Sequence, residues 1–552
     1  MAATEAPTAT ETDKAITALL ESRPPATDNF TYLTIVEKFL RPEVLPTLNE
    51  VLQDASLTQE IGWDLVQNLV SIPGSDQCLE TIARLGNPRE VIVKCLEVLE
   101  GYPGDAERDG SVEEEEAETA GQEEVEEAAE EGQSRRHHHR KDDDDAAERL
   151  LLSFVLSVLE AYVNARPPSW AERLVESYAP QRIVPGKRSA LQAFKEEQDL
   201  LARDTIVGQL AALCRDLGVR TDSPSFISTV CKEPIYRRTL PDADDLKGAQ
   251  DIHLPTGGAV CLLAYSLFSS TVFGANVANP DMRLFPDHFA LLQRHIEDDA
   301  HAQIQATPGT IEAIVAVGLW LQHNGRTLPP TPSASEDDES ATPAFMPYHH
   351  LLTLCSVYHP SLGVRNAAST LAGQVLHADP DDEDRLRILE DLLENCMFSN
   401  LKACAVTWLR EELAAALDAK TTTTTSTSRS PFAGPEAVEH LQYLVFPDMQ
   451  FAREMDRDAF VEYFLQNAPF ILQSVNFAIL LFRSADDHFG RLAPPGMRAA
   501  VEERYVRPLL AAVAAFEEEG GKAPGDDDDH AVAHVAMEVS ILGASLRRLT
   551  AP

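Results

Sequence analysis

The sequence predicts an all-α protein, specifically a HEAT- or armadillo-like α-solenoid with disordered acidic inserts. Apolar residues recur at helical spacing almost everywhere between the inserts, and alternating strand patterns bounded by tight turns are scarce. One helical pattern also repeats after 37 residues. With 552 residues, 44% of them hydrophobic, the chain can form several ordinary domains or one extended repeat array.

The first 100 residues contain clear helical signals, and residues 12–100 are predicted to form N-terminal helical repeats. In "TQEIGWDLVQNLVSIPG", one apolar stripe is followed by a Pro73-Gly74 stop; its members are Ile61, Leu65, Val66 and Leu69. In "CLETIARLGNPREVIVKCLEVL", Asn87 is a favoured N-cap and Pro88 suits the first helical position. We therefore expect two helices joined at Leu85-Gly86, with Cys78 and Cys95 on apolar faces.

A repeat is visible in residues 346–419, which are predicted to form a HEAT-like repeat pair. Aligning "LGVRNAASTLA" with "SNLKACAVTWL" pairs an apolar residue, a basic residue and small residues with their counterparts 37 positions later. The aligned positions are Val364 and Leu401, Ala368 and Ala405, and Leu371 and Trp408. The acidic start of "DPDDEDRLRILEDLLENC" predicts another helix between them, because carboxylates are stabilised at a helix N-terminus. Chance similarity between two amphipathic helices is the competing explanation.

Polar segments divide the rest of the chain. Residues 101–147 contain the runs "SVEEEEAETAGQEEVEEAAEEG" and "RRHHHRKDDDD" with few apolar residues and are predicted to be a disordered acidic insert. Residues 326–345 are predicted to be a disordered loop, and residues 420–435 a low-complexity linker. The remaining segments are predicted to be middle helical repeats over residues 148–325 and a C-terminal helical region over residues 436–552.

The chain is strongly acidic, with 89 Asp and Glu residues against 46 Lys and Arg residues and a formal net charge of −43. Such a surface repels phosphate backbones and anionic membrane surfaces, so no nucleic-acid or membrane partner is expected.

No secretory signal is visible, and the longest apolar runs are about half the length of a spanning helix. Eight cysteines without a CxxC pair favour a reducing compartment, so we expect the protein in the cytoplasm, with the nucleus as a second location.

No motif for catalysis, cofactor binding or metal binding is present. Nucleophile elbows, phosphate-binding glycine loops and HExxH helices are all missing from the sequence. Gly257 and Gly258 are best interpreted as a turn before a buried helix. The run His137–His139 is surrounded by arginine and lysine, which oppose a bound cation. The sequence therefore predicts no catalytic, cofactor-binding or metal-binding residue, no cofactor and no enzymatic activity.

Cys231 is the candidate redox-sensitive thiol. It precedes Lys232 and is followed by Arg237 and Arg238, and a nearby positive charge lowers the pKa of a thiol. The other seven cysteines lie in apolar helical runs, where a thiol behaves as a small hydrophobic group. A structural role for Cys231 is the favoured alternative.

Thr331, Ser333 and Ser335 lie in the acidic, proline-containing loop and are candidate phosphorylation sites. Chance is the competing explanation, because hydroxyl residues beside acids or prolines are common in such loops.

Three stretches resemble a known family. "LTQEIGWDLVQNLVSIPGSDQCLETIARLGNPREVIVKCLEVL" is similar to the N-terminal signature of the fungal Yap-binding proteins, which are grouped with glomulin and the plant aberrant-lateral-root protein. "TPGTIEAIVAVGLWL" resembles a second block, and "HPSLGVRNAASTL…LLENCMFSNLKACAVTWLREEL" a third. These blocks are spread over residues 58–415, and all are helix-packing motifs.

The resemblance implies a HEAT-like α-solenoid without enzymatic activity that holds other proteins. Our leading hypothesis is a Yap-binding-type adaptor that supports peroxide-induced activation of an AP-1-like bZIP transcription factor in the oxidative-stress response. A kinetochore-associated adaptor and a glomulin-like regulator of a cullin-RING ubiquitin ligase are alternatives of the same class. The alternative of another class is a thiol peroxide sensor that uses Cys231.

Overall fold

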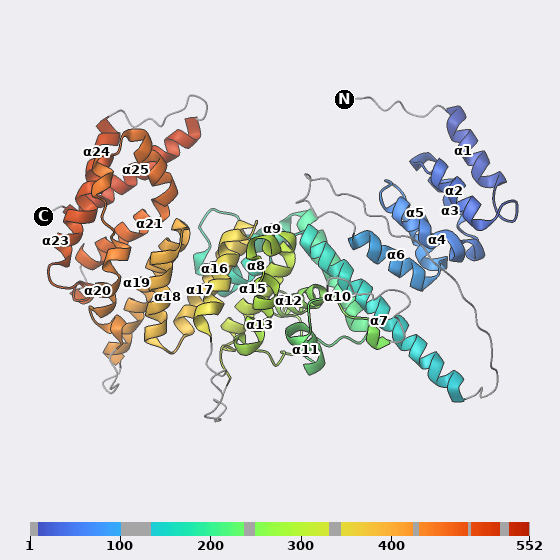
Figure 1. Cartoon of the computed structure of the whole chain (residues 1–552), viewed down its shortest axis with the longest axis horizontal. Helices are drawn as coiled ribbons and strands as arrows, with labels where there is room; N and C mark the ends of the chain where they lie inside the picture. The colour runs from blue at the N-terminus through green and yellow to red at the C-terminus, as the bar shows by residue number, and fades with distance from the viewer. Residues whose placement is uncertain are drawn as a thin grey trace. The chain divides into compact units, whose positions relative to one another are not determined.

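Helices are the only regular secondary structure in the residues that the computed structural model describes, which are 9–100, 134–236, 249–329, 344–422, 430–483, 487–518 and 529–550. Figure 1 shows them in chain order. The all-α prediction is confirmed. The chain divides into two compact units: unit 1 comprises Met1–Asp281 and Gln305–Val317, and unit 2 comprises Met282–Ile304 and Gly318–Pro552. These divisions fall inside the predicted middle region 148–325, which the sequence treats as one segment. Apolar periodicity shows which face of a helix is buried, but it does not show which neighbouring helix covers that face, so the divisions could not be predicted from it.

Unit 1 is built mainly from the first twelve helices. They are α1 (Ala9–Glu21), α2 (Asn29–Phe39), α3 (Leu45–Val51), α4 (Ala55–Val70), α5 (Asp76–Leu85), α6 (Pro88–Glu100), α7 (Ser134–Ala165), α8 (Trp170–Tyr178), α9 (Ala190–Glu196), α10 (Gln198–Asp216), α11 (Pro224–Lys232) and α12 (Thr256–Val272). One unit boundary lies between Asp281 and Met282, after α12, and the other two fall within α14 (Ala300–Ala306) and α15 (Pro308–His323).

Unit 2 contains the remaining helices. They are α13 (Phe289–Ile296), α16 (Phe345–Tyr358), α17 (Leu362–Ala378), α18 (Asp382–Asn395), α19 (Ser399–Thr422), α20 (Glu436–Val445), α21 (Arg457–Arg483), α22 (Asp487–Gly490), α23 (Met497–Val501), α24 (Arg507–Glu518) and α25 (Asp529–Thr550). Single-turn helices punctuate both units: η1 (Pro42–Val44), η2 (Pro180–Arg182), η4 (Ala249–Asp251), η5 (Leu284–His288), η7 (Pro431–Ala433), η8 (Gln450–Arg453) and η9 (Glu502–Val506).

Local capping signals place the first helices where the sequence predicts them. The predicted stripe on α4 is buried, and Gly74 has a φ of +86°, a backbone conformation that suits glycine at this turn. At the start of α6, the Asn87 side chain accepts a hydrogen bond from the Arg89 N–H at 3.1 Å. Cys78 is buried and Cys95 is half-buried against the same apolar core. The helix-turn-helix prediction for this segment is confirmed.

Helical structure extends into the segments that the sequence predicts to be disordered or linking. Helix α7 begins at Ser134, inside the predicted insert 101–147, so the end of that insert at residue 147 was placed too late. Residues 101–133 lie outside the described part of the chain. Helix α16 begins at Phe345 and helix α19 ends at Thr422, so the segments 326–345 and 420–435 are also shorter than predicted. Polar composition masks a helix end, because a solvent-facing helical turn has the same composition as a loop.

Small residues allow α12 to approach α7 closely. Gly257 and Gly258 lie within the first turn of α12 and are fully buried, so the sequence interpretation of a turn before the helix was wrong. A Cβ at position 258 would lie 2.3 Å from the Leu156 carbonyl oxygen, which is closer than real Cβ atoms approach. Glycine is required here because the backbones of two helices are in contact.

Helices α16, α17, α18 and α19 pack on one another within unit 2 (Figure 1). All three aligned pairs of the 37-residue repeat are buried: Val364 with Leu401, Ala368 with Ala405, and Leu371 with Trp408. The indole of Trp408 also fills the space beside Gly373 of α17, where a Cβ would lie 2.3 Å from Trp408 Nε1. The repeated sequence pattern therefore corresponds to a repeated burial pattern.

Helix α21 has the length and apolar composition to cross a membrane. Half of its most apolar window is buried inside the protein, and it packs against α19 and α25. Phe460, Phe464 and Val475 are among its buried residues. Burial in the core of unit 2 accounts for the apolar character of these side chains.

Candidate protein-interaction surface

The structure places Cys231 inside unit 1. Its side chain, near the end of α11, is 4% exposed. Arg237 and Arg238, which motivated the sensor hypothesis, lie outside the described residues. Burial favours the structural role that the sequence analysis preferred, because a redox-sensing thiol has to be reached by its oxidant.

Cys396 lies outside the helical run in which the sequence places it. The sequence places it in an apolar helical run, yet it lies half-buried in the connection after α18. Burial is the larger influence on its thiol and raises the pKa, although Lys402 nearby acts in the opposite direction. The residue is therefore accessible without being activated.

The candidate phosphorylation sites Thr331, Ser333 and Ser335 lie outside the described residues. Within the part of the chain that the structure describes, no group of three or more His, Cys, Asp or Glu side chains is arranged to hold a metal ion.

Two carboxyl groups in unit 1, those of the buried Glu312 and the half-buried Glu160, escaped the sequence analysis. Burial raises the pKa of Glu160 and of Glu312 to about 7. Glu312 Oε1 accepts a hydrogen bond from the Ala171 N–H at 3.3 Å, at the start of α8. Glu160 accepts from the Gly258 N–H, at the start of α12. Each carboxyl group thus caps the N-terminus of a neighbouring helix, where unsatisfied N–H groups and the helix dipole favour it.

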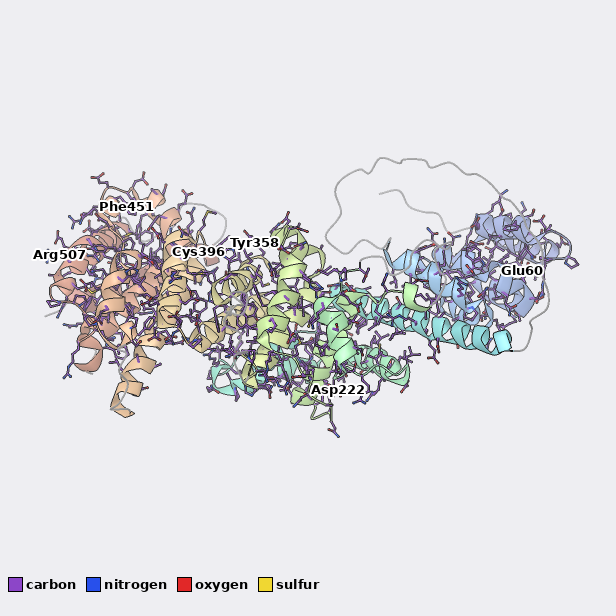
Figure 2. The ribbon with its side chains drawn as sticks, turned by 60° about the horizontal axis from the view of Figure 1, so that its bottom comes forward. Glu60, Asp222, Tyr358, Cys396, Phe451 and Arg507 are labelled. Carbon is purple, nitrogen blue, oxygen red and sulfur yellow. The ribbon has the colours of Figure 1, made fainter. Side chains whose placement is uncertain are left out.

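The most prominent exposed apolar surface of α16–α19 lies at one end of these helices. We define the apolar patch as Tyr358, Met397 and Phe398. Met397 is 89% exposed, and the Tyr358 and Phe398 rings meet edge to face with centroids 6.0 Å apart. Leu362, at the start of α17, is 60% exposed and extends the apolar surface near Tyr358. Figure 2 shows Tyr358 and Cys396 near each other at this end of the helices.

Hydrogen bonds hold the backbone of the two connections that carry the apolar patch. The Phe398 carbonyl oxygen accepts from the N–H groups of Leu401 and Lys402, each at 3.1 Å, so Phe398 lies at the N-cap position of α19. The Phe398 N–H in turn points at Cys396 Sγ, 3.4 Å away. In the other connection, the Ser361 N–H donates to His359 Nδ1 at 3.1 Å. These bonds hold the backbone of both connections.

A network of polar side chains joins α17, α18 and α19 at another point along these helices. Glu412, only 3% exposed, accepts hydrogen bonds from His377 Nδ1 at 2.6 Å and from Arg385 Nη1 at 2.8 Å. His377 Nε2 also lies 3.0 Å from Glu411 Oε2. These contacts join α17, α18 and α19, and the two carboxylates raise the pKa of His377 to about 9 against the opposing effect of burial. The imidazole is therefore protonated at neutral pH and pairs with both carboxylates.

The sequence analysis missed the apolar patch because it counted the cysteine and its neighbours as part of a helix. The string "ENCMFSN" contains the signal that would have revealed it. Asn395 and Ser399 are residues that favour helix ends and starts, and they bracket two large apolar residues. Apolar side chains inside such a break cannot lie on the buried stripe of either helix.

The chain belongs to the family Kinetochor_Ybp2, described as an uncharacterised protein family, YAP/Alf4/glomulin, which matches residues 1–136 and 117–539. This confirms the resemblance seen in the sequence. No curated protein matches the chain.

Proposed function

We propose that this protein is a non-enzymatic adaptor that binds other proteins, and that the apolar patch is a contact surface for its partner. The observation that carries this proposal is an exposed Met397 beside a fixed Tyr358–Phe398 ring pair. Family membership supports the adaptor class. The carboxyl groups of Glu160, Glu312 and Glu412 are engaged in capping or pairing helices, which favours a structural use of these groups over catalysis.

A HEAT-like solenoid is the architecture that we propose for this adaptor. The support is the burial of all three residue pairs related by 37 positions in α17 and α19. In such arrays each repeat contacts mainly its neighbours, and partners bind along extended surfaces.

The partner that we propose is an AP-1-like bZIP transcription factor whose peroxide-induced activation the adaptor supports, in the cytoplasm and the nucleus. A basic segment of that factor would be attracted by the acidic surface, which raises the association rate. Kinetochore components and a cullin-RING ligase are the alternative partners. The peroxide-sensor alternative gains no support from Cys231, whose side chain is buried.

The test is affinity purification of the tagged protein from cells of its source, with and without peroxide. Wild type is compared with the double variant Met397→Ser/Phe398→Ser and with the matched control Leu465→Ser, which alters a side chain that is 53% exposed elsewhere in unit 2. We expect a bZIP factor with wild type and the control after peroxide, and at least about tenfold less with the double variant.

Equal recovery of the bZIP factor with all three proteins would show that the apolar patch is not its contact surface. Recovery of kinetochore subunits or of a cullin-RING complex, independent of peroxide, would replace the stress-response partner. Circular dichroism and thermal unfolding of the double variant ensure that lost binding does not reflect lost folding.

A further inference from the structure

A second surface of unit 2 is rich in arginine, although the chain as a whole is acidic. Helices α19, α21 and α25 enclose a groove of about 470 Å³. Arginines from all three helices line it: Arg410, Arg483 and Arg548. No carboxylate is among the described residues that line the groove, although acidic residues outnumber basic ones by 89 to 46 in the whole chain.

A carboxylate that lies near Arg410, that of Glu411, is also engaged elsewhere. Arg410 Nη2 lies 4.0 Å from Glu411 Oε1, a long contact between partly exposed side chains. The other oxygen of Glu411 accepts a hydrogen bond from protonated His377 at 3.0 Å. Glu411 therefore lies closer to the imidazolium than to Arg410 and offsets the charge of Arg410 only in part.

The lining of the groove also includes apolar side chains. Ile479 and Leu480 of α21 are half-buried and line it between the arginines. Gln473, also in the lining, donates a hydrogen bond from Nε2 to Thr407 Oγ1 at 2.8 Å, which joins α21 to α19. A ligand that fills this groove must therefore present anionic groups to the arginines and apolar groups to α21.

We propose that this groove binds an acidic peptide segment of a partner protein, in which Asp or Glu alternates with large apolar residues. Arginine pairs with carboxylates through two parallel hydrogen bonds, and the guanidinium plane suits this geometry. A groove of this volume accommodates a few residues of such a segment. A nucleic acid is disfavoured, because its long phosphate backbone would extend over the acidic surface around the groove. The inference is independent of the apolar patch and of its partner.

The test measures fluorescence anisotropy of a fluorescein-labelled peptide of about ten residues that alternates Asp or Glu with Leu or Phe, titrated with the full chain. The groove variant is Arg483→Ala/Arg548→Ala, and the matched control is Arg498→Ala/Arg507→Ala, which removes two exposed arginines of unit 2 outside the groove. We expect the groove variant to bind at least about tenfold more weakly than the wild type, and the control to bind within about twofold.

Other outcomes overturn the proposal. Equal weakening in both variants would indicate a general charge effect, and undiminished binding by the groove variant would exclude the groove. A peptide with Asn and Gln in place of the acids that binds as well would exclude recognition of carboxylates. Tighter binding of an oligouridine would assign the groove to nucleic acid. Stronger competition by a peptide of residues 111–132 would assign it to the chain's own acidic segment.

Discussion

The imidazole Nδ1 of His377 lies 2.6 Å from Oε1 of Glu412, and this pairing joins the end of α17 to the middle of α19. Glu412 is buried and also accepts a hydrogen bond from Arg385. One carboxylate thus connects three consecutive helices. Arg385 keeps its charge, whereas His377 titrates, so the part of the stabilisation that His377 supplies depends on a proton.

The first prediction concerns this proton. Burial opposes the charge on His377, but hydrogen bonds to Glu411 and Glu412 raise its pKa to about 9 from the ordinary value of 6.5. Because the folded state binds the proton more tightly, the stabilisation is fully present below about pH 6.5 and is lost as the pH rises through about 9. Allowing for partial exposure of the ring, we expect a loss of roughly 2 kcal/mol between about pH 6 and about pH 10.

Urea unfolding of the wild type and of His377→Gln at both pH values measures this effect. The glutamine variant lacks the titrating group and should show a correspondingly smaller dependence on pH. The same dependence in both proteins would mean that His377 does not carry the effect.

The second prediction concerns the buried ion pair of unit 1. Nη1 and Nη2 of Arg173 donate to the two carboxylate oxygens of Asp204, at 2.9 and 2.7 Å, and the guanidinium lies over the Phe194 and Phe268 rings. Replacement of Arg173 by Met leaves a largely buried carboxylate without its cation. We expect Arg173→Met to lower the free energy of unfolding by about 3–5 kcal/mol.

The double variant Arg173→Met/Asp204→Leu should recover most of this loss, because it removes the stranded charge as well. A surface control is Arg23→Met, which breaks the 2.9 Å pair with Asp54 between side chains that are 39% and 42% exposed. It should cost less than about 1 kcal/mol. If the double variant were as unstable as the single one, the cost would come from packing and not from charge.

The third prediction concerns the contact between Gly373 and Trp408. A Cβ at position 373 would lie 2.3 Å from Trp408 Nε1, so Gly373→Ala must move the indole or the helix. We expect a loss of stability of about 1–3 kcal/mol, because overpacking a close-packed core is destabilising. Thermal unfolding and Trp fluorescence measure it.

The matched control for this variant is Gly490→Ala, where the nearest atom is a carbonyl oxygen 3.9 Å away. It should change the stability by less than about 0.5 kcal/mol. An unchanged melting temperature in Gly373→Ala would contradict the close packing of α17 against α19.

The fourth prediction concerns thiol accessibility. Cys396 lies half-buried in a connection, whereas Cys231 is 4% exposed. Iodoacetamide labelling of the native protein, followed by mass spectrometry, should modify Cys396 at least about tenfold faster than Cys231. In denaturant the two rates should become similar. Faster native labelling of Cys231, or its oxidation by peroxide in the purified protein, would revive the sensor hypothesis.

The sequence predicts most of the helical structure because the signals are local. Asn87 and Pro88 mark the start of α6, and the apolar stripe of α4 marks its buried face. Both depend on residues within a few positions of each other, so one chain suffices to recognise them. The aligned positions 371 and 408 were found in the same way, since a repeat needs only self-comparison.

The surface and the buried polar groups escaped prediction for a physical reason. Glu312 caps a helix that begins at Trp170, far away in the sequence, and no local pattern encodes such a pairing. The burial of Cys231 likewise depends on what packs against α11, and the groove at Arg410 requires arginines from three helices to meet. The prediction that Cys396 lies in a helix was wrong because a short apolar loop and an apolar helical turn have similar residue compositions.

The contact between Gly373 and Trp408 has a consequence for evolution within the family. The indole occupies the volume that a side chain at position 373 would need, so neither residue can change freely while the other is kept. Among relatives, a larger residue at position 373 should accompany a smaller one at position 408. The two positions should therefore covary, and a lineage that lost the glycine first would have passed through a less stable intermediate.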